Sequence, residues 1–224
     1  MLLNFYKNGL PPYFSRNEPV VYSLVAIAFP VLYIVLQIFW PQIPILVWQT
    51  LCFAAPSIWF CRWANLQRAF VKSDFWRKLI VVLLLSILIS LTMNGLAEIW
   101  EEYFPLPDFM MKAYEGLFHT QAPFGFCFDL LQIAIVPAMA EEFLFRGVIL
   151  TGLLKKFSPL VAVLLNALLF ATYHLDPWHL PFLFALGLFF ATIYVKTNNL
   201  WLAMVSHFIN NAIGVIYYYQ AGHL

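Results

Sequence analysis

Long apolar runs separated by short connections are the feature that most restricts how this chain folds. Seven runs come close to the roughly 20 residues that a helix needs to cross a bilayer core. They cover residues 20–40, 43–60, 79–97, 124–154, 159–174, 180–195 and 200–219. Backbone groups in lipid must form their hydrogen bonds internally, and no run alternates like a barrel strand. The sequence therefore predicts an all-α fold, a polytopic bundle of about seven transmembrane helices.

The composition agrees with an integral membrane protein and excludes two other classes. Hydrophobic residues make up 63% of the 224 residues and charged residues 10%, whereas soluble domains carry about 25% charged residues. The formal net charge is +1 without a basic block, so we expect no nucleic-acid partner. Three cysteines without CxxC spacing indicate neither a disulfide framework nor a thiolate zinc site. We predict one membrane domain over residues 1–224, with a core of functional helices over residues 124–219.

The charges outside the apolar runs predict the orientation of the chain. Between the second and third runs, cations alternate with aromatic rings, as in an interfacial amphipathic segment. The members of this basic segment are Arg62, Trp63, Arg68, Phe70, Lys72, Phe75, Trp76, Arg77 and Lys78. Lys155, Lys156 and Lys196 follow on the same side, so the positive-inside rule predicts a cytoplasmic amino-terminus. No signal-peptide cleavage site is apparent, and we expect the first run to stay as an anchor.

Ionisable residues interrupt the fourth apolar run. Glu141, Glu142 and Arg146 occur in the sequence EEFLFR, at a depth where each charge costs on the order of 3 kcal/mol. Two later runs carry further polar residues, His174 in FATYH and His207 with Asn211 in SHFINN. Ionisable side chains within a membrane bundle indicate a functional site.

Helix geometry separates the two glutamates. Glu142 and Arg146 are four residues apart and share a helix face, so we expect them to form an ion pair. Glu141 is rotated about 100° away from Glu142 and is left without the arginine. A buried carboxylate without a cation needs another partner, which is typical of a general base. His174 and His207 are the available partners.

The depths of these residues agree with a shared site. Glu141 lies 14 residues before Lys155, and His174 lies 15 residues after Pro159, so both are about 21 to 23 Å from the turn that joins their helices. This level lies in or near the outer half of the hydrocarbon. His207 and Asn211 share a face of the last run, about 10 and 17 Å from its start. They reach the site if that helix sits deeper or tilts.

A purely structural interpretation exists for each residue taken alone. Glu142 with Arg146 forms a buried ion pair, and His174, His207 and Asn211 hold neighbouring helices together by hydrogen bonds. The common level of the residues favours a functional site over this alternative. We interpret Phe170 as a packing residue and place His119, His179 and His223 outside the site.

The three motifs, in this order on successive helices, resemble EExxxR, FxxxH and HxxxN of the CAAX-protease and bacteriocin-processing family, also called CPBP or Abi. This family includes the Ras-converting CAAX endopeptidases. The resemblance implies an enzyme, an intramembrane endopeptidase in which Glu141 and His174 activate a water. It also implies that His207 and Asn211 stabilise the oxyanion, while Glu142 and Arg146 support these groups. The residue chemistry agrees, because a carboxylate and an imidazole share the proton of water and N–H donors suit a developing negative charge.

The resemblance leaves cofactor and substrate open. A metal-free glutamic mechanism is our prediction, because Arg146 opposes a cation; the alternative is zinc held by Glu141, His174 and His207. We expect a membrane-associated protein or peptide as substrate, either a carboxy-terminal sorting signal or a CAAX-like tail, and a bacterial inner-membrane location. A rival interpretation from another class is a non-catalytic membrane immunity factor or scaffold that binds a peptide without cleaving it.

Overall fold

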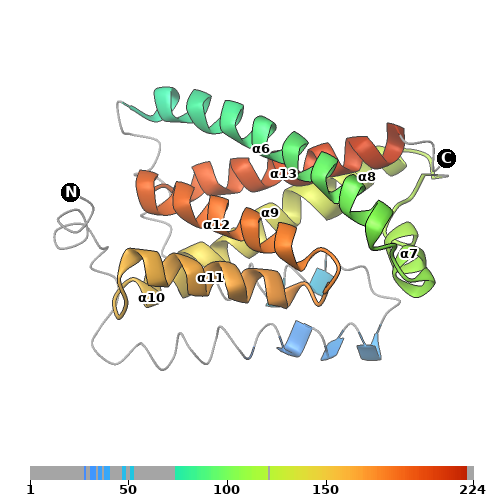
Figure 1. Ribbon diagram of the computed structural model, residues 1–224, viewed down its shortest axis with the longest axis horizontal. Coiled ribbons are helices and arrows are strands. Elements are labelled where there is room, and N and C mark those ends of the chain that lie inside the picture. The colour runs from blue at the N-terminus through green and yellow to red at the C-terminus, as the bar shows by residue number, and fades with distance from the viewer. Residues whose placement is uncertain are drawn as a thin grey trace.

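The protein is a bundle of helices (Figure 1). The computed structural model describes residues 28, 31–33, 35–36, 38–40, 47–48, 51–52, 74–120 and 122–220, and none of these residues forms a strand. The α-helices are α6 (Phe75–Tyr103), α7 (Asp108–Glu115), α8 (Gly125–Asp129), α9 (Val136–Glu142), α10 (Thr151–Leu153), α11 (Pro159–Tyr173), α12 (Leu180–Thr197) and α13 (Leu200–Gln220). Two π-helices, η2 (Leu130–Ile135) and η3 (Phe143–Leu150), join α8, α9 and α10 into one continuous run.

The all-α membrane fold is confirmed. Each of the five later predicted spans corresponds to α6, the run from α8 to α10, α11, α12 or α13. Of these, α6, α12 and α13 are long and apolar enough to cross a bilayer, and α11 is a shorter apolar helix. Most of the first two predicted spans and most of the basic segment lie outside the described residues, so the count of seven spans stays a prediction. The last residues of that segment, from Phe75 to Lys78, form the first turn of α6.

Local sequence signals explain where the helices begin and end. Pro159 occupies the first turn of α11, and the Ser158 side chain accepts a hydrogen bond from Val161 N. Asn198 ends α12 with a φ of 50°, a left-handed conformation that asparagine tolerates well. The next residue, Asn199, accepts hydrogen bonds from two backbone N–H groups at the start of α13.

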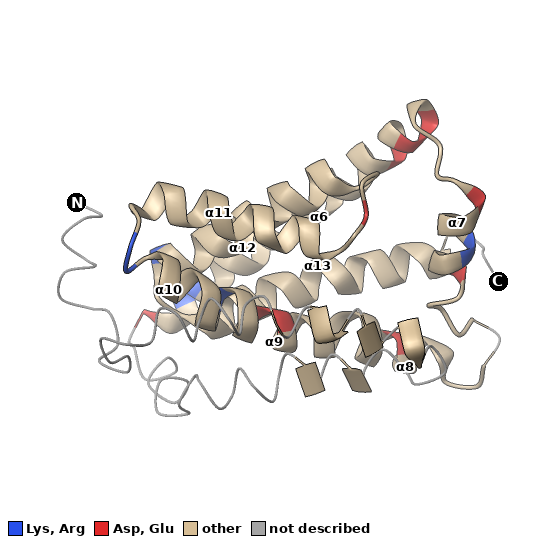
Figure 2. Ribbon diagram, turned by 90° about the horizontal axis from the view of Figure 1, so that it is seen from below, with Lys and Arg blue, Asp and Glu red and all other residues tan. Residues whose placement is uncertain are grey.

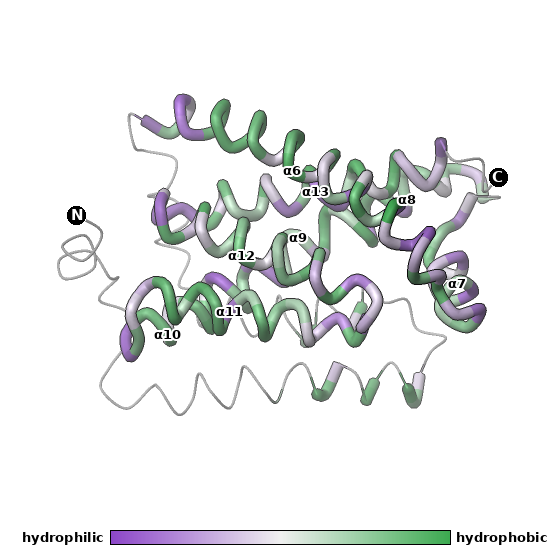
Figure 3. The backbone as a smooth tube through the Cα atoms, viewed as in Figure 1, coloured by the Kyte–Doolittle hydropathy of each residue, from purple (hydrophilic) through white to green (hydrophobic). Residues whose placement is uncertain are grey.

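The helix α13 is central to the arrangement. It packs against α6, α12, η2 and α9, while α11 packs mainly against α12 (Figure 1). On α6, Ser86 Oγ forms a hydrogen bond with Ser206 Oγ of α13 at 2.7 Å, a small-residue contact typical of helices in membranes. Other residues of α6 are apolar and exposed, including Leu84, Leu88 and Leu91 (Figure 3). A long apolar face of this kind is suited to lipid.

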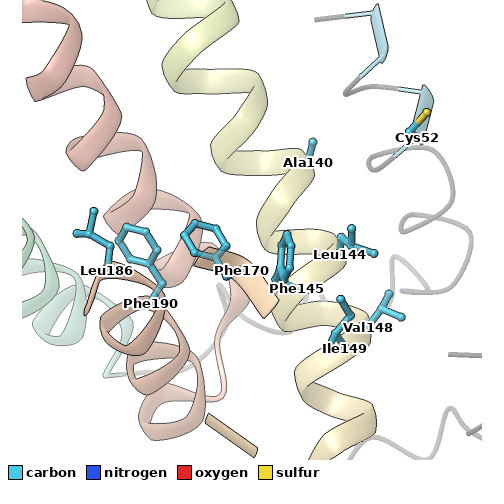
Figure 4. Packing of buried hydrophobic residues seen from close by; sticks show 9 residues of the cluster. All are labelled: Cys52, Ala140, Leu144, Phe145, Val148, Ile149, Phe170, Leu186 and Phe190. Carbon is cyan, nitrogen blue, oxygen red and sulfur yellow. The ribbon is translucent and has the colours of Figure 1, made fainter. Parts of the chain in front are cut away.

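Aromatic rings fill the space beside the candidate site. Phe145 of η3, Phe170 of α11 and Phe190 of α12 lie next to one another (Figure 4), with ring centroids 5.2 Å apart for the first pair and 6.2 Å for the second. Edge-to-face contacts between such rings stabilise a core beyond their buried area. The same cluster contains Cys52 and packs against Tyr33. The described parts of the first predicted spans thus contact the core that surrounds the site.

The run from α8 to α10 departs from regular α-helix on both sides of the two glutamates. Pro137 in α9 has no N–H to offer to the carbonyl four residues earlier, which is that of Ile133. Asn211 Nδ2 donates to this Ile133 carbonyl at 3.0 Å. In η3, Asn166 Nδ2 of α11 donates to Phe145 O at 2.8 Å. Neighbouring helices thus supply hydrogen bonds that the irregular backbone needs inside a bilayer.

Acidic residues gather at one end of the bundle (Figure 2). There, four side chains join α6, α7 and the connection between α11 and α12. Asp176 accepts hydrogen bonds from Tyr114 and from His179 Nδ1, the second at 2.6 Å. His179 Nε2 lies 2.8 Å from Glu101 Oε1. We call Glu101, Tyr114, Asp176 and His179 the Asp176 cluster.

The Asp176 cluster favours a charged histidine between two carboxylates. Burial alone disfavours the imidazolium, but the hydrogen bonds with Asp176 and Glu101 outweigh it and raise the pKa of His179. Burial also opposes ionisation of Asp176, yet the hydrogen bonds from His179 and Tyr114 lower its pKa to about 2.

These shifts predict how the stability of the cluster depends on pH. The contribution of His179 is complete below its ordinary pKa of 6.5 and disappears as the pH rises through its raised value. The contribution of Asp176 is complete above 3.8 and disappears as the pH falls towards about 2. We therefore expect amide hydrogen exchange at Trp178 and His179, after correction for intrinsic rates, to be slowest between pH 3.8 and pH 6.5, where both contributions are complete. In His179→Gln, the corrected exchange rate should no longer rise at high pH. A rise equal to that of the wild type would contradict the assignment of this pH dependence to His179.

Candidate active site

A buried ion pair occupies the centre of the bundle. Arg146 Nη1 donates to Glu142 Oε1 at 2.8 Å, and both side chains are fully buried. The same oxygen lies 2.9 Å from His207 Nδ1. Glu142 therefore connects the arginine on its own helix run with the histidine on α13, and the predicted pairing of Glu142 with Arg146 is present.

Arg146 also holds α12. Its Nη2 donates to the carbonyl oxygen of Gly187 at 3.0 Å. A Cβ atom at position 187 would lie 3.1 Å from Ala167 Cα and 3.2 Å from Phe170 Cδ1, so glycine permits the close approach of α11 and α12. The guanidinium carbon lies 4.6 Å from the centroid of the Phe170 ring, which suits a cation–π contact. The positive charge is thus enclosed by a carboxylate, a carbonyl and an aromatic face.

Glu141 faces the two histidines. Its Oε2 lies 3.8 Å from His174 Nε2 and 4.0 Å from His207 Nε2. This oxygen is buried and makes no hydrogen bond within the described part of the chain. The three groups come from α9, from the end of α11 and from α13. Both separations are too long for direct hydrogen bonds and within the range that a bridging water spans.

The partners of the histidines assign their ring protons. His174 Nδ1 lies 2.7 Å from the carbonyl oxygen of Phe170; because a carbonyl only accepts, Nδ1 carries the hydrogen. In a neutral His174, Nε2 is then the basic nitrogen, and it points to Glu141. In His207, Nδ1 likewise donates to Glu142, which leaves Nε2 on the side of Glu141. Each ring therefore directs the same nitrogen towards one point.

The predicted common depth of Glu141 and His174 agrees with the short distance between their side chains. The predicted depth of His207 agrees less well, and the packing of α13 explains why. Leu200 and Trp201, at the start of α13, pack against Phe143 and Met204. Phe143 lies 12 residues before Lys155, so α13 begins well inside the bundle and not at the level of the turn that joins α10 with α11. This deeper start brings His207 to Glu141.

Asn211 has a different immediate partner from the other candidates. One N–H group of its amide is committed to Ile133 O, the carbonyl that Pro137 leaves free. Asn211 lies one turn beyond His207 on the same helix face, and the second N–H group of the amide remains for another acceptor. Its predicted oxyanion role therefore depends on this second group.

The donor types of the site suit zinc, whereas the charge beside them opposes it. Zinc takes imidazole nitrogen and carboxylate oxygen, which are the donors that Glu141, His174 and His207 offer. Among the residues that the structure describes, however, no group of three His, Cys, Asp or Glu side chains is arranged to hold a metal ion. The charge of Arg146, paired with the neighbouring Glu142, also opposes a second cation.

Several contributors to the site are absent from the sequence-based set. The Phe190 ring stacks on His207 with centroids 4.7 Å apart and an interplanar angle of 15°, and Gly187 supplies a carbonyl to Arg146. A further buried group that the sequence-based set omits lies outside the site: Asp129, fully buried in α8, accepts hydrogen bonds from His119 and Tyr219. Only Asp129 carries a recognisable signal, namely a carboxylate within an apolar run; Phe190 and Gly187 are unremarkable in their surroundings.

The enclosure of Arg146 predicts a non-additive effect on stability. Arg146→Met leaves the Glu142 carboxylate buried without its cation, and we expect the free energy of unfolding to fall by about 3–5 kcal/mol. Adding Glu142→Gln removes this uncompensated charge, so the double variant loses less than the sum of the single variants. Denaturant unfolding in detergent measures both. Lys156→Met, which removes an exposed cation, serves as control with an expected change within about 0.5 kcal/mol. If the decrease for the double variant equals the sum of the two single decreases, the energetic coupling of Glu142 with Arg146 is contradicted.

The helices that carry these residues are similar in sequence to those of known proteins. Residues 123–213 match the family described as type II CAAX prenyl endopeptidase Rce1-like. YdiL of Bacillus subtilis (strain 168), named as a membrane peptidase, is 32% identical over 83 residues, which cover 37% of this chain and 34% of YdiL. The membrane-embedded CAAX protease MroQ of Staphylococcus aureus (strain USA300) is 29% identical over 91 residues, which cover 38% of this chain and 37% of MroQ.

The chain matches about a third of the length of each of these curated relatives. No solved structure gives a significant match. The matched segment begins just before α8 and ends within α13, and it contains Glu141, Glu142, Arg146, His174, His207 and Asn211. The resemblance to the CAAX-protease family that the three sequence motifs indicate is therefore confirmed, for the Rce1-like segment from residue 123 to residue 213.

Proposed function

We propose that this protein is an intramembrane endopeptidase of the glutamic type. The observation that carries the proposal is the convergence of Glu141 Oε2 with the Nε2 atoms of His174 and His207, at 3.8 and 4.0 Å, from three separate helices. The match of residues 123–213 to type II CAAX prenyl endopeptidases supports the same reaction class.

Glu141 and His174 activate the attacking water in this proposal. The uncommitted Glu141 Oε2 accepts a proton from water, while the basic His174 Nε2 orients the same water by a hydrogen bond. The resulting hydroxide attacks the carbonyl carbon of the scissile peptide bond. The proton then passes to the peptide nitrogen as the C–N bond breaks, so one water is consumed for each bond cleaved.

His207 and Asn211 stabilise the negative charge that develops on the carbonyl oxygen. Glu142 accepts the Nδ1 hydrogen of His207 and so holds the ring with Nε2 directed towards the scissile bond, where an Nε2–H group donates to the oxyanion. The second N–H group of Asn211 supplies a further donor. Arg146 keeps the Glu142 carboxylate in place for this purpose. In this scheme the supporting residues act through His207 and do not touch the substrate.

The burial of the site favours a substrate that reaches it from within the bilayer. Glu141 is only 4% exposed and His207 3% exposed, whereas the His174 side chain is 27% exposed. We propose a membrane-associated protein or peptide, with a carboxy-terminal sorting signal or a CAAX-like tail as the cleaved segment. The substrate approaches from the His174 side, which is the acidic end of the bundle. The proposed location is the bacterial inner membrane with a cytoplasmic amino-terminus.

Replacement of Glu141 tests catalysis directly. Glu141→Gln keeps the shape of the side chain and removes its capacity as a base, so we expect processing to fall by at least about a hundredfold, in the range of a general base. Quantitative proteomics of host membranes, with and without the variant, measures which precursors accumulate and which new termini vanish.

Glu102→Gln is the matched control, because Glu102 is exposed on α6 and undergoes the same chemical change. It should process as wild type does. Equal termini in wild type and Glu141→Gln, with equal protein in the membrane, refute the protease and favour a peptide-binding scaffold or immunity factor.

The metal-free mechanism predicts resistance to chelators. Washed membranes treated with EDTA or 1,10-phenanthroline should process the accumulated precursor at the untreated rate, because no step uses a metal. Loss of processing with restoration by added zinc would assign Glu141, His174 and His207 to a metal site instead.

A further inference from the structure

The connection between α11 and α12 directly follows His174. His174 is the C-cap residue of α11, and Asp176, two residues later, is buried at 7% exposure. One carboxylate oxygen, Oδ1, accepts hydrogen bonds from Trp178 N at 3.1 Å and from His179 N at 3.0 Å. The other oxygen, Oδ2, accepts from Tyr114 and His179 side chains within the Asp176 cluster. Asp176 therefore fixes the backbone of this connection through Oδ1 and ties it to other elements through Oδ2.

The end of α11 determines how the His174 ring is held. His174 N bonds to Ala171 O at 3.3 Å and Leu175 N bonds to Thr172 O at 3.2 Å. These bonds span three residues and not four, so the helix tightens in its last turn. The Phe170 carbonyl, which would accept His174 N in a regular α-helix, accepts His174 Nδ1 instead. The orientation of the ring thus depends on the tightened end.

The tightened end requires an unfavourable backbone conformation next to His174. Leu175 has a φ of 53°, in the left-handed region that leucine rarely occupies. Its side chain is 65% exposed, so burial of the side chain does not explain why this conformation persists. Surrounding contacts must impose it. Directly after Leu175, Asp176 Oδ1 fixes the backbone by accepting hydrogen bonds from Trp178 N and His179 N. Pro177 also disfavours a helical backbone at Asp176.

We propose that Asp176 is a positioning residue for His174. By holding the connection through Oδ1, it keeps Leu175 left-handed, His174 Nδ1 on the Phe170 carbonyl and His174 Nε2 directed at Glu141. The importance of this arrangement for catalysis rests on the proposed function of His174, but the arrangement itself does not.

Substitutions separate the two halves of the Asp176 contacts. Asp176→Asn retains an oxygen for Trp178 N and His179 N and loses the acceptor for Tyr114 and His179 Nδ1. Asp176→Ala loses both halves. Leu175→Gly in the Asp176→Ala background lets the backbone adopt the left-handed conformation without assistance.

Nitrogen NMR of the histidine rings tests the proposal without a substrate. Full-length protein with ring-15N histidine is studied in detergent micelles, and the His174 resonances are assigned as those missing in His174→Gln. We expect a single Nδ1–H tautomer for His174 in wild type and in Asp176→Asn, a mixture of tautomers in Asp176→Ala, and recovery of the single tautomer in Leu175→Gly/Asp176→Ala. An unchanged His174 spectrum in Asp176→Ala overturns the proposal. If neither Asp176→Ala nor the double variant folds, Asp176 is a residue of general stability and the proposal is likewise overturned.

Processing of the accumulated precursor supplies the second readout. Asp176→Ala should process at least about tenfold more slowly than wild type, Asp176→Asn should retain most of the activity, and Glu102→Gln should change neither readout. Lost processing with an unchanged His174 spectrum overturns the positioning role. A changed His174 spectrum in Asp176→Ala, with no processing by the wild type, supports the positioning role and refutes the proposed function instead.

Discussion

Glu142 and Arg146 lie in the interior of the bundle, where neither charge is tolerated without the other. Their ion pair reaches beyond its own helix run, because Arg146 also bonds to the Gly187 carbonyl of α12 and Glu142 also binds His207 of α13. Three helices are therefore fixed relative to one another by one pair of opposite charges. Misplacing any of them leaves a buried charge or a buried carbonyl unsatisfied, which is far costlier than the loss of an apolar contact. The positions of His207 and Phe190 follow from this constraint.

Much of this arrangement could be predicted from the sequence, since helix periodicity and the rise per residue are nearly invariant in lipid. The five later spans appear close to their predicted bounds. The spacing of Glu142 and Arg146 predicts their pair, and counting residues from one turn predicts that Glu141 and His174 share a level. The link between Asn211 and Ile133 also follows from local rules once the partner helix is known, because Pro137 frees that carbonyl.

Other parts depend on how helices are offset from one another, which no local pattern encodes. Residue counting places His207 too close to the start of its span, because the first residues of α13 pack beside Phe143. Gly187 and Phe190 resemble every other glycine and phenylalanine in the apolar runs until Arg146 and His207 are placed against them. His179 is not among the predicted site residues, yet its link to Asp176 and Glu101 lies beside the His174 connection. Such polar contacts between distant segments appear only in three dimensions.

The distribution of Glu141, His174 and His207 over three helices has a consequence for biosynthesis. A ribosome releases the helix run with Glu141 first, α11 with His174 later, and α13 with His207 after both. Before α13 is inserted and packed, Glu142 lacks its histidine and Glu141 faces one imidazole at most. The proposed catalytic arrangement therefore does not exist in the nascent chain. The order of synthesis itself thus delays the proposed chemistry until the membrane domain is assembled.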